Sequence, residues 1–181
     1  MLTLWDILPK LMRPAAQPRP AAVNRISKPR PSVSRSHERY DELARDLLEE
    51  YGVRVRKWRS SMSGVAWQVT YQDGTVSRLI EAPKPRGPMS AAVFCHEIGH
   101  HAIGFHRYKP RCLEEFHAWD WALKEMERRG VNVTDRVRER MHESLHYAIQ
   151  KAARRGLKQL PVELAPFMSP PPRKSDLSAS A

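Results

Sequence analysis

Cysteine is scarce in this chain, with only Cys95 and Cys112 among 181 residues. Two cysteines cannot build the disulfide framework that stabilises small secreted proteins, so that class is excluded. Long hydrophobic runs are also lacking, since no apolar stretch approaches the roughly 20 residues that a transmembrane helix needs. We therefore expect a soluble cytoplasmic protein without a signal peptide and without a membrane partner.

Acidic residues are few outside the middle of the chain, and the formal net charge is +11. Residues 1–35 hold seven basic side chains against one acidic, and residues 128–158 hold nine against three, whereas residues 36–127 are close to neutral. Basic flanks attract polyanions through counterion release, which makes nucleic acid or an acidic protein a reasonable partner. A solubilising surface accounts for the same charges equally well.

Proline is concentrated toward both ends, where ten of the fifteen prolines lie before Ser32 or from Pro166 onward. The length suits one domain rather than two. We therefore predict three parts: a basic, proline-rich flexible arm over 1–35, a domain with a basic C-terminal helix over 36–160, and a Pro/Ser-rich tail over 161–181.

Hydrophobic periodicity predicts an α+β fold for the domain. Apolar residues at helical spacing predict four helices: 36–51, 91–102 capped by Ser90, 113–126, and 134–156 capped by Thr134. Alternation of apolar and polar residues predicts a three-stranded antiparallel sheet: 53–58, 65–71 and 75–80. An Asp-Gly pair at residues 73 and 74 is typical of a hairpin between the last two strands.

The second predicted helix contains the sequence His96-Glu97-Ile98-Gly99-His100. On a helix, residues four apart share a face, so both imidazoles can bind one metal ion, and these residue types suit zinc. Glu97 lies one position round the helix, beside the metal, where its carboxylate can take a proton from zinc-bound water. The motif predicts a metal-activated hydrolase with Glu97 as general base, and Gly99 predicts close helix packing.

A third metal ligand is expected on the following helix. Glu115 falls in line with Trp119 and Met126 on an apolar face, where a glutamate is costly unless it is paired or bound to a metal. Glu115 is therefore the favoured ligand. Glu114 is the reserve candidate.

The same spacing occurs a second time, at His142-Glu143-Ser144-Leu145-His146. This copy lies in a polar, arginine-rich predicted helix, and no well-placed acidic ligand follows it. We interpret it as a surface helix whose histidines happen to align. Alternatively, these histidines face the first site and stabilise an oxyanion, a role for which the other candidates are His106, Tyr108 and Tyr147.

The order of predicted elements and the first motif together resemble the ImmA/IrrE-type metallopeptidases of bacterial mobile elements, phages and stress regulation. The resemblance covers roughly residues 36–127. It implies a minimal zincin-like domain with a gluzincin-like site, in which His96, His100 and Glu115 hold Zn²⁺ and Glu97 is catalytic. It also implies a protein substrate, such as a DNA-bound repressor.

Two functions of different class remain open. The first is a zinc metallopeptidase that acts on a regulatory protein. The second is a non-enzymatic nucleic-acid-binding or adaptor protein of a mobile element, with a structural or vestigial metal site. The intact Glu97 favours the first, because a relic has no reason to keep a glutamate that is not a ligand. An extended substrate is expected to pair with an edge strand at 75–80, where Arg78 favours acidic peptides.

Overall fold

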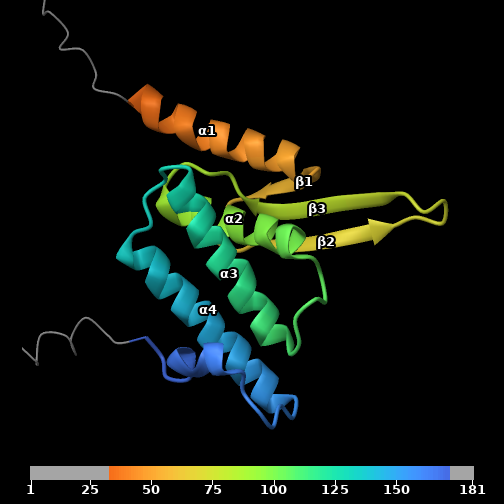
Figure 1. Cartoon of the computed structure of the whole chain (residues 1–181). Helices are drawn as coiled ribbons and strands as arrows, with labels where there is room; N and C mark the ends of the chain where they lie inside the picture. The colour runs from red at the N-terminus through yellow and green to blue at the C-terminus, as the bar shows by residue number, and fades with distance from the viewer. Residues whose placement is uncertain (1–32, 172–181) are drawn as a thin grey trace, which may run out of the picture. The chain divides into compact units, whose positions relative to one another are not determined.

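Figure 1 shows the protein as a computed structural model, which describes residues 33–171. Most of the predicted arm and the end of the predicted tail lie outside these residues, so the three-part division stays a prediction. The described helices are α1 (Val33–Glu50), α2 (Pro88–Ile103), α3 (Arg111–Arg128), α4 (Asp135–Arg154) and the 3₁₀ helix η2 (Val162–Phe167). The strands are β1 (Val53–Arg59), β2 (Val65–Thr70) and β3 (Val76–Pro83). The predicted α+β class and the order of the elements are confirmed.

The sheet is mixed rather than antiparallel, with the strand order β1-β3-β2. The predicted hairpin is present, because β2 pairs antiparallel with β3. The antiparallel prediction is wrong for β1, which pairs parallel with β3. Residues 60–64 lead from β1 at one edge of the sheet to β2 at the other edge. The chain then turns back through the hairpin, and β3 lies between β1 and β2. Alternating strand patterns encode which face is buried but not which strands are neighbours.

This order also corrects the expected substrate edge. The strand predicted over 75–80 is β3, which lies in the centre of the sheet with both of its sides paired. Its backbone groups are therefore not free to bind an added peptide strand. The edges are β1 and β2.

The core lies between one face of the sheet and α1 and α2, where Leu47, Ile80 and Phe94 are completely buried. α2 runs between the sheet and α3, so that residues 90–101 are buried all round the helix. Gly99 permits this arrangement, because a Cβ there would lie 2.7 Å from the Ala118 carbonyl oxygen of α3. The close packing predicted from Gly99 is confirmed.

The helix caps explain where α2 and α4 begin. α2 starts at Pro88, earlier than predicted, because proline is well suited to a first helical turn. Ser90 lies inside this turn, where its hydroxyl accepts hydrogen bonds from the backbone N–H of Arg86 and Gly87 at 2.9 and 3.2 Å. The predicted cap of α4 is confirmed, since the Thr134 side chain accepts from the Val137 N–H.

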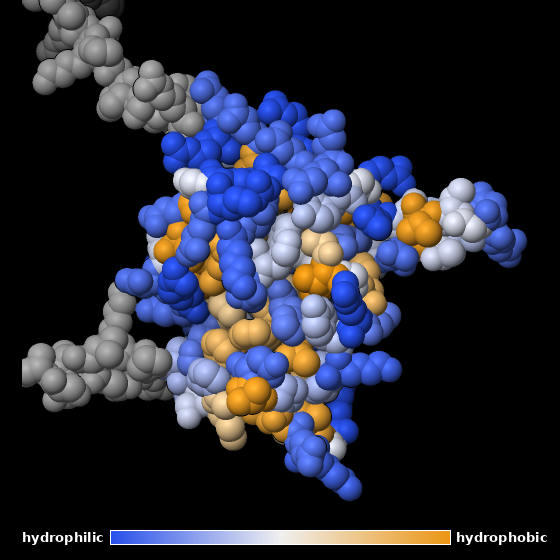
Figure 2. All heavy atoms as spheres, in the orientation of Figure 1, coloured by the Kyte–Doolittle hydropathy of each residue, from blue (hydrophilic) through white to orange (hydrophobic). Residues whose placement is uncertain are grey.

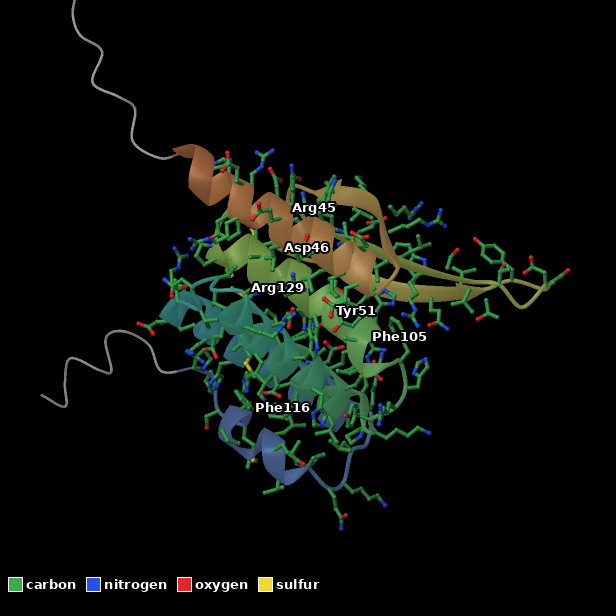
Figure 3. All side chains as sticks on the ribbon, turned by 45° about the horizontal axis from the view of Figure 1, so that its top comes forward. Arg45, Asp46, Tyr51, Phe105, Phe116 and Arg129 are labelled. Carbon is green, nitrogen blue, oxygen red and sulfur yellow. The ribbon has the colours of Figure 1, made fainter. Side chains whose placement is uncertain are left out.

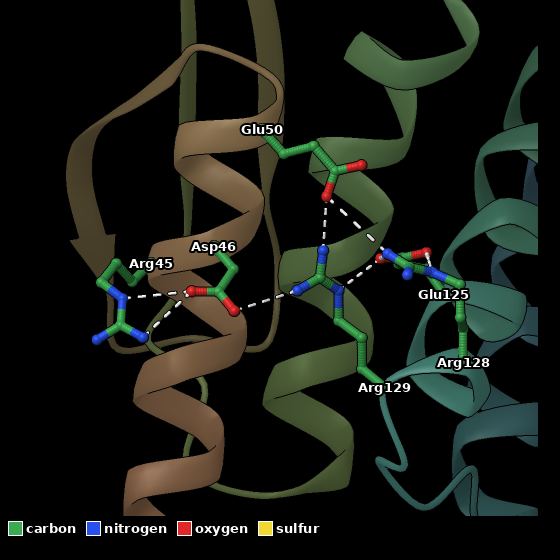
Figure 4. Close-up of polar contacts among 6 residues, drawn as sticks. All are labelled: Arg45, Asp46, Glu50, Glu125, Arg128 and Arg129. Atoms are coloured by element: carbon green, nitrogen blue, oxygen red, sulfur yellow. Dashed lines mark hydrogen bonds and ion pairs between the residues drawn. The ribbon is translucent and has the colours of Figure 1, made fainter.

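Arg129, at the end of α3, joins α3 to α1 (Figure 4). Its guanidinium donates to Glu125 at 2.5 Å, to Glu50 at 2.6 Å and to Asp46 at 3.4 Å. One arginine thus holds the two helices that enclose one end of α2. Such a network fixes orientation more than it adds stability, because the Asp46 and Glu50 side chains remain partly exposed.

η2 packs against α3 and α4. Figure 3 places Phe116 on the side of α3 that faces η2, and its ring lies 6.0 Å from that of Phe167. Figure 2 shows hydrophobic side chains gathered on this part of a largely hydrophilic surface, and Val162 and Met168 are among the exposed ones.

Within the described residues, no helix is both long enough and apolar enough to cross a bilayer.

Candidate metal centre

The two histidines of the first motif and the favoured glutamate meet between α2 and α3. The Nε2 atom of His96 lies 3.3 Å from Glu115 Oε2, and the Nε2 atom of His100 lies 3.5 Å from the same oxygen. One ligand atom from each residue can be chosen so that all three lie within 4.8 Å of one another. The structure therefore brings the three predicted ligands together in a group that could hold a metal ion.

Two of these spacings are compatible with a tetrahedral metal ion such as zinc. Two ligands bound at about 2.0–2.1 Å to a tetrahedral ion are about 3.3–3.4 Å apart. The distances from Glu115 Oε2 to the two Nε2 atoms, 3.3 and 3.5 Å, are close to this value. Two imidazoles and one carboxylate are also the donor set of a catalytic zinc site, which leaves a fourth position open.

Glu114 faces the other nitrogen of His100 and is almost fully buried, with 1% of its surface exposed. Its Oε1 lies 3.6 Å from His100 Nδ1, and its Oε2 accepts a 2.8 Å hydrogen bond from the backbone N–H of His106. The two adjacent glutamates thus contact different nitrogens of one ring. Glu114 holds the loop after α2 through its bond with His106, and its other oxygen lies opposite His100 Nδ1, the position that outer carboxylates occupy in zinc sites.

Burial and neighbouring charges set the protonation of the metal-free group. Burial lowers the pKa of His96 to about 4. Burial would also lower the pKa of His100, but contacts with the carboxylates of Glu114 and Glu115 outweigh it and raise this pKa to about 9. Burial opposes ionisation of Glu115, yet its contacts with His100 and His96 hold its pKa well below the usual range. The metal-free site therefore holds an ionised Glu115 beside a protonated His100.

Trp119 supports the His96 ring. The indole stacks on the imidazole with ring centroids 4.4 Å apart and planes 21° apart. Trp119 follows Glu115 by four residues, so one face of α3 supplies both the carboxylate and the ring that orients a partner. Trp119 thus packs directly against a candidate ligand.

Glu97 lies beside the triad and has 5% of its surface exposed. Burial raises its pKa to about 7, close to the value that suits a general base at neutral pH. The backbone of Gly64 passes directly over its carboxylate, and a Cβ at Gly64 would come within 2.4 Å of Glu97 Cγ. Any larger residue at position 64 would force the Glu97 side chain or the loop to shift.

His96, Glu97 and Glu115 open into a cavity of about 1130 Å³, which also borders α4 and the loop before β2. This volume slightly exceeds that of most small-molecule sites and is sufficient for several residues of a peptide. His100 is not among the lining residues and lies deeper. Arg140 of α4 lines the cavity and donates to the Met62 carbonyl at 3.2 Å, which joins α4 to the loop before Gly64.

The two histidines of the second His-Glu-x-x-His string turn away from this cavity, whereas Glu143 and Ser144 between them line it. His142 Nε2 lies 2.8 Å from the Ser169 carbonyl oxygen, and His146 Nδ1 lies 3.1 Å from that of Phe167. Gln150 bonds the remaining His146 nitrogen at 2.8 Å. The alternative in which these histidines face the first site is therefore wrong, because both rings bind the backbone of the segment after α4.

Two of the other candidate oxyanion donors remain. His106 and Tyr147 line the cavity, whereas Tyr108 is absent from its lining and stacks on His117 with centroids 3.8 Å apart. Arg78 is also absent from this lining, and it donates to the Tyr51 carbonyl at 3.0 Å. Arg78 thus has no contact with the site that it was expected to serve.

Sequence reasoning missed two residues of the site. Glu114 was only the reserve ligand, although a glutamate on the face shared with Ala118 and Trp121 is itself a signal of burial. No local pattern marks Gly64, because its role depends on the passage of a loop over a distant helix.

Comparison with protein-family models, curated proteins and solved structures found no match to this chain. The site geometry is thus the main support for the family resemblance.

Proposed function

We propose that this chain is a zinc-dependent metallopeptidase in which His96, His100 and Glu115 hold the ion. The observation that carries the proposal is the convergence of both histidine Nε2 atoms on one oxygen of Glu115, with Glu97 beside them in the same cavity. A purely structural metal site has no use for an adjacent buried carboxylate that is not among the converging ligand atoms.

Each residue has a defined task in this mechanism. Zinc in such a site supplies an acidified water and polarises the scissile carbonyl. Glu97 accepts the proton of the attacking water on a carboxylate oxygen and donates it to the leaving amine nitrogen. His106 and Tyr147 line the same cavity, and we propose that one of them donates to the developing oxyanion.

The substrate proposed is an extended segment of a regulatory protein, such as the repressor that the family resemblance implies. β2 is the edge strand that begins next to the cavity, since Gly64, which lines the cavity, directly precedes Val65. We propose that an extended peptide pairs with this edge and continues from there into the cavity. The basic flanks remain a proposed route to nucleic acid.

Hydrolysis by the zinc-loaded protein is the test of this proposal. A digest of denatured cellular proteins supplies peptides of every sequence, and mass spectrometry detects new termini. We expect the Glu97→Gln variant to lose about 10²- to 10⁴-fold in rate while it keeps zinc. The matched control is Glu139→Gln, an exposed residue of α4 that does not line the cavity. Equal cleavage by wild type and Glu97→Gln would disprove the mechanism and favour the non-enzymatic adaptor.

A further inference from the structure

One face of α4 lines the cavity over three turns. Its lining residues recur every three or four positions, which is the spacing of a single helix face. They run from Arg140, Glu143 and Ser144 to Lys151, and Arg155, the C-cap residue just after α4, continues the same face. From Ser144 to Arg155 this face is about 16 Å long at 1.5 Å per residue. An extended peptide of about five residues covers the same length. The cavity therefore has room for recognition at a distance from the reacting bond.

The two ends of this face differ in charge. Arg140, at one end, lies 3.8 Å from the Glu143 carboxylate and donates to the loop before β2. At the other end, Lys151 and Arg155 have no carboxylate within 4.0 Å among the described residues. A cavity end with two unpaired cations attracts a carboxylate.

The position of this end relative to the metal centre follows from the topology. α3 and α4 are antiparallel neighbours (Figure 1), so the end of α4 lies beside the start of α3. Pro110 and Arg111, at that start, line the same cavity. Arg111 is engaged with Glu115 at 3.1 Å and with Glu114 at 3.4 Å. Lys151 and Arg155 are thus exposed cations of the same cavity that have no carboxylate partner among the described residues.

We infer that Lys151 and Arg155 form an anion subsite, which binds a carboxylate of the peptide substrate at a fixed position on one side of the cleaved bond. This inference rests on the proposed peptidase function, since it names the substrate class of the same cavity. The carboxylate can come from an Asp or Glu side chain or from a peptide C-terminus, because both present the same group.

A favourable charge at the end of a helix explains some basic residues without any ligand. Arg154 and Lys158 serve this purpose equally well, and neither lines the cavity. The inference applies only to the pair that faces the cavity. A comparison of the two pairs therefore separates recognition from the general effect of charge.

Binding to the zinc-loaded Glu97→Gln protein tests the inference without turnover. The probes are fluorescein-labelled decapeptide pools in which one position is Glu or Gln and the others are uncharged, and fluorescence anisotropy reports their affinity. We expect Glu to improve binding about fivefold at one position, as for two partly screened ion pairs. Raised salt should reduce this preference. C-terminally amidated pools distinguish the sources, since they lose binding only if the terminal carboxylate is the ligand.

The variants make the assignment specific. The double variant Lys151→Glu and Arg155→Glu should lose the preference, whereas Arg154→Glu and Lys158→Glu, an equal change of charge at the same helix end, should keep it. Lys151→Gln is a milder change that should reduce the preference, and circular dichroism verifies each fold. Equal binding of all pools, or a preference that survives in the folded Lys151/Arg155 variant, would overturn the subsite. A failure of the proposed peptidase function is recognised by a separate result, in which the wild type and the Glu97→Gln variant cleave peptides equally.

Discussion

The chain contains the same His-Glu-x-x-His spacing twice, and the structure gives the two copies different surroundings. In α2, His96 and His100 converge on the carboxylate of Glu115. In α4, His142 and His146 bind two backbone carbonyls of the segment that follows the helix. The spacing aligns two imidazoles in both places. The groups that approach each histidine pair from another element decide its role. A carboxylate allows the pair to hold a metal ion, whereas backbone carbonyls leave it to fix the following segment.

The two glutamates show the same difference. Glu97 is buried against Gly64 and faces the cavity beside the triad. Glu143 occupies the corresponding position of the second copy, but its side chain is 56% exposed and lies 3.8 Å from Arg140. Burial beside the triad makes Glu97 a candidate general base, whereas Glu143, which also lines the cavity, is exposed and faces Arg140.

The covering loop is the feature that most sharply distinguishes the first copy. Gly64→Ala places a methyl group within 2.4 Å of the Glu97 side chain, so Glu97 or the loop must move. We expect peptide hydrolysis to fall about 100-fold, as for a reacting group displaced by about 1 Å. Bound zinc should be unchanged. Steady-state rates and metal content, measured on the same sample, check this, and a fully active Gly64→Ala protein would contradict the placement of Glu97.

The outer partners of the histidines provide the second comparison. Glu114→Gln removes the charge opposite His100 Nδ1 and should weaken zinc binding about 10- to 100-fold. Gln150→Ala removes the outer partner of His146 and should leave zinc binding unchanged. Competition with a chelating dye gives both affinities. If Glu114→Gln binds zinc as tightly as the wild type, Glu114 does not orient the ligand.

The protonation of His100 provides a further test of the metal centre. The raised pKa of His100, about 9, means that its ring is protonated at pH 8, whereas His96, at about 4, is already neutral. Zinc binds the unprotonated ring, so each ion should release at least the proton of His100, and affinity should rise with pH up to about 9. Calorimetry in two buffers of different ionisation enthalpy counts the protons. Binding without release would contradict the contacts assigned to His100.

The second copy should affect stability rather than metal binding. His146→Ala leaves the Phe167 carbonyl without its partner, and the free energy of unfolding should fall by about 1–2 kcal/mol. The zinc content should not change. Urea unfolding of the wild type and the variant measures the difference. No loss of stability would show that the contact with the segment after α4 is dispensable.

Local features of the fold and the site could be predicted from the sequence, and the long-range ones could not. Helical spacing is a local property, so His96, His100 and the apolar face of Glu115 are recognisable from the order of residues alone. The role of Gly64 depends on a loop that crosses a distant helix. The central place of β3 depends on a choice between strand orders that the alternation patterns do not record.

The most direct test of the central claim is a comparison of bound metal in two double variants. His100→Ala with Glu115→Ala removes two members of the first group, and His142→Ala with His146→Ala removes both histidines of the second string. We predict one equivalent of zinc in the wild type and in the second variant, and almost none in the first. Zinc that persists in the first variant, or is lost only from the second, would contradict the assignment of the metal centre to α2 and α3.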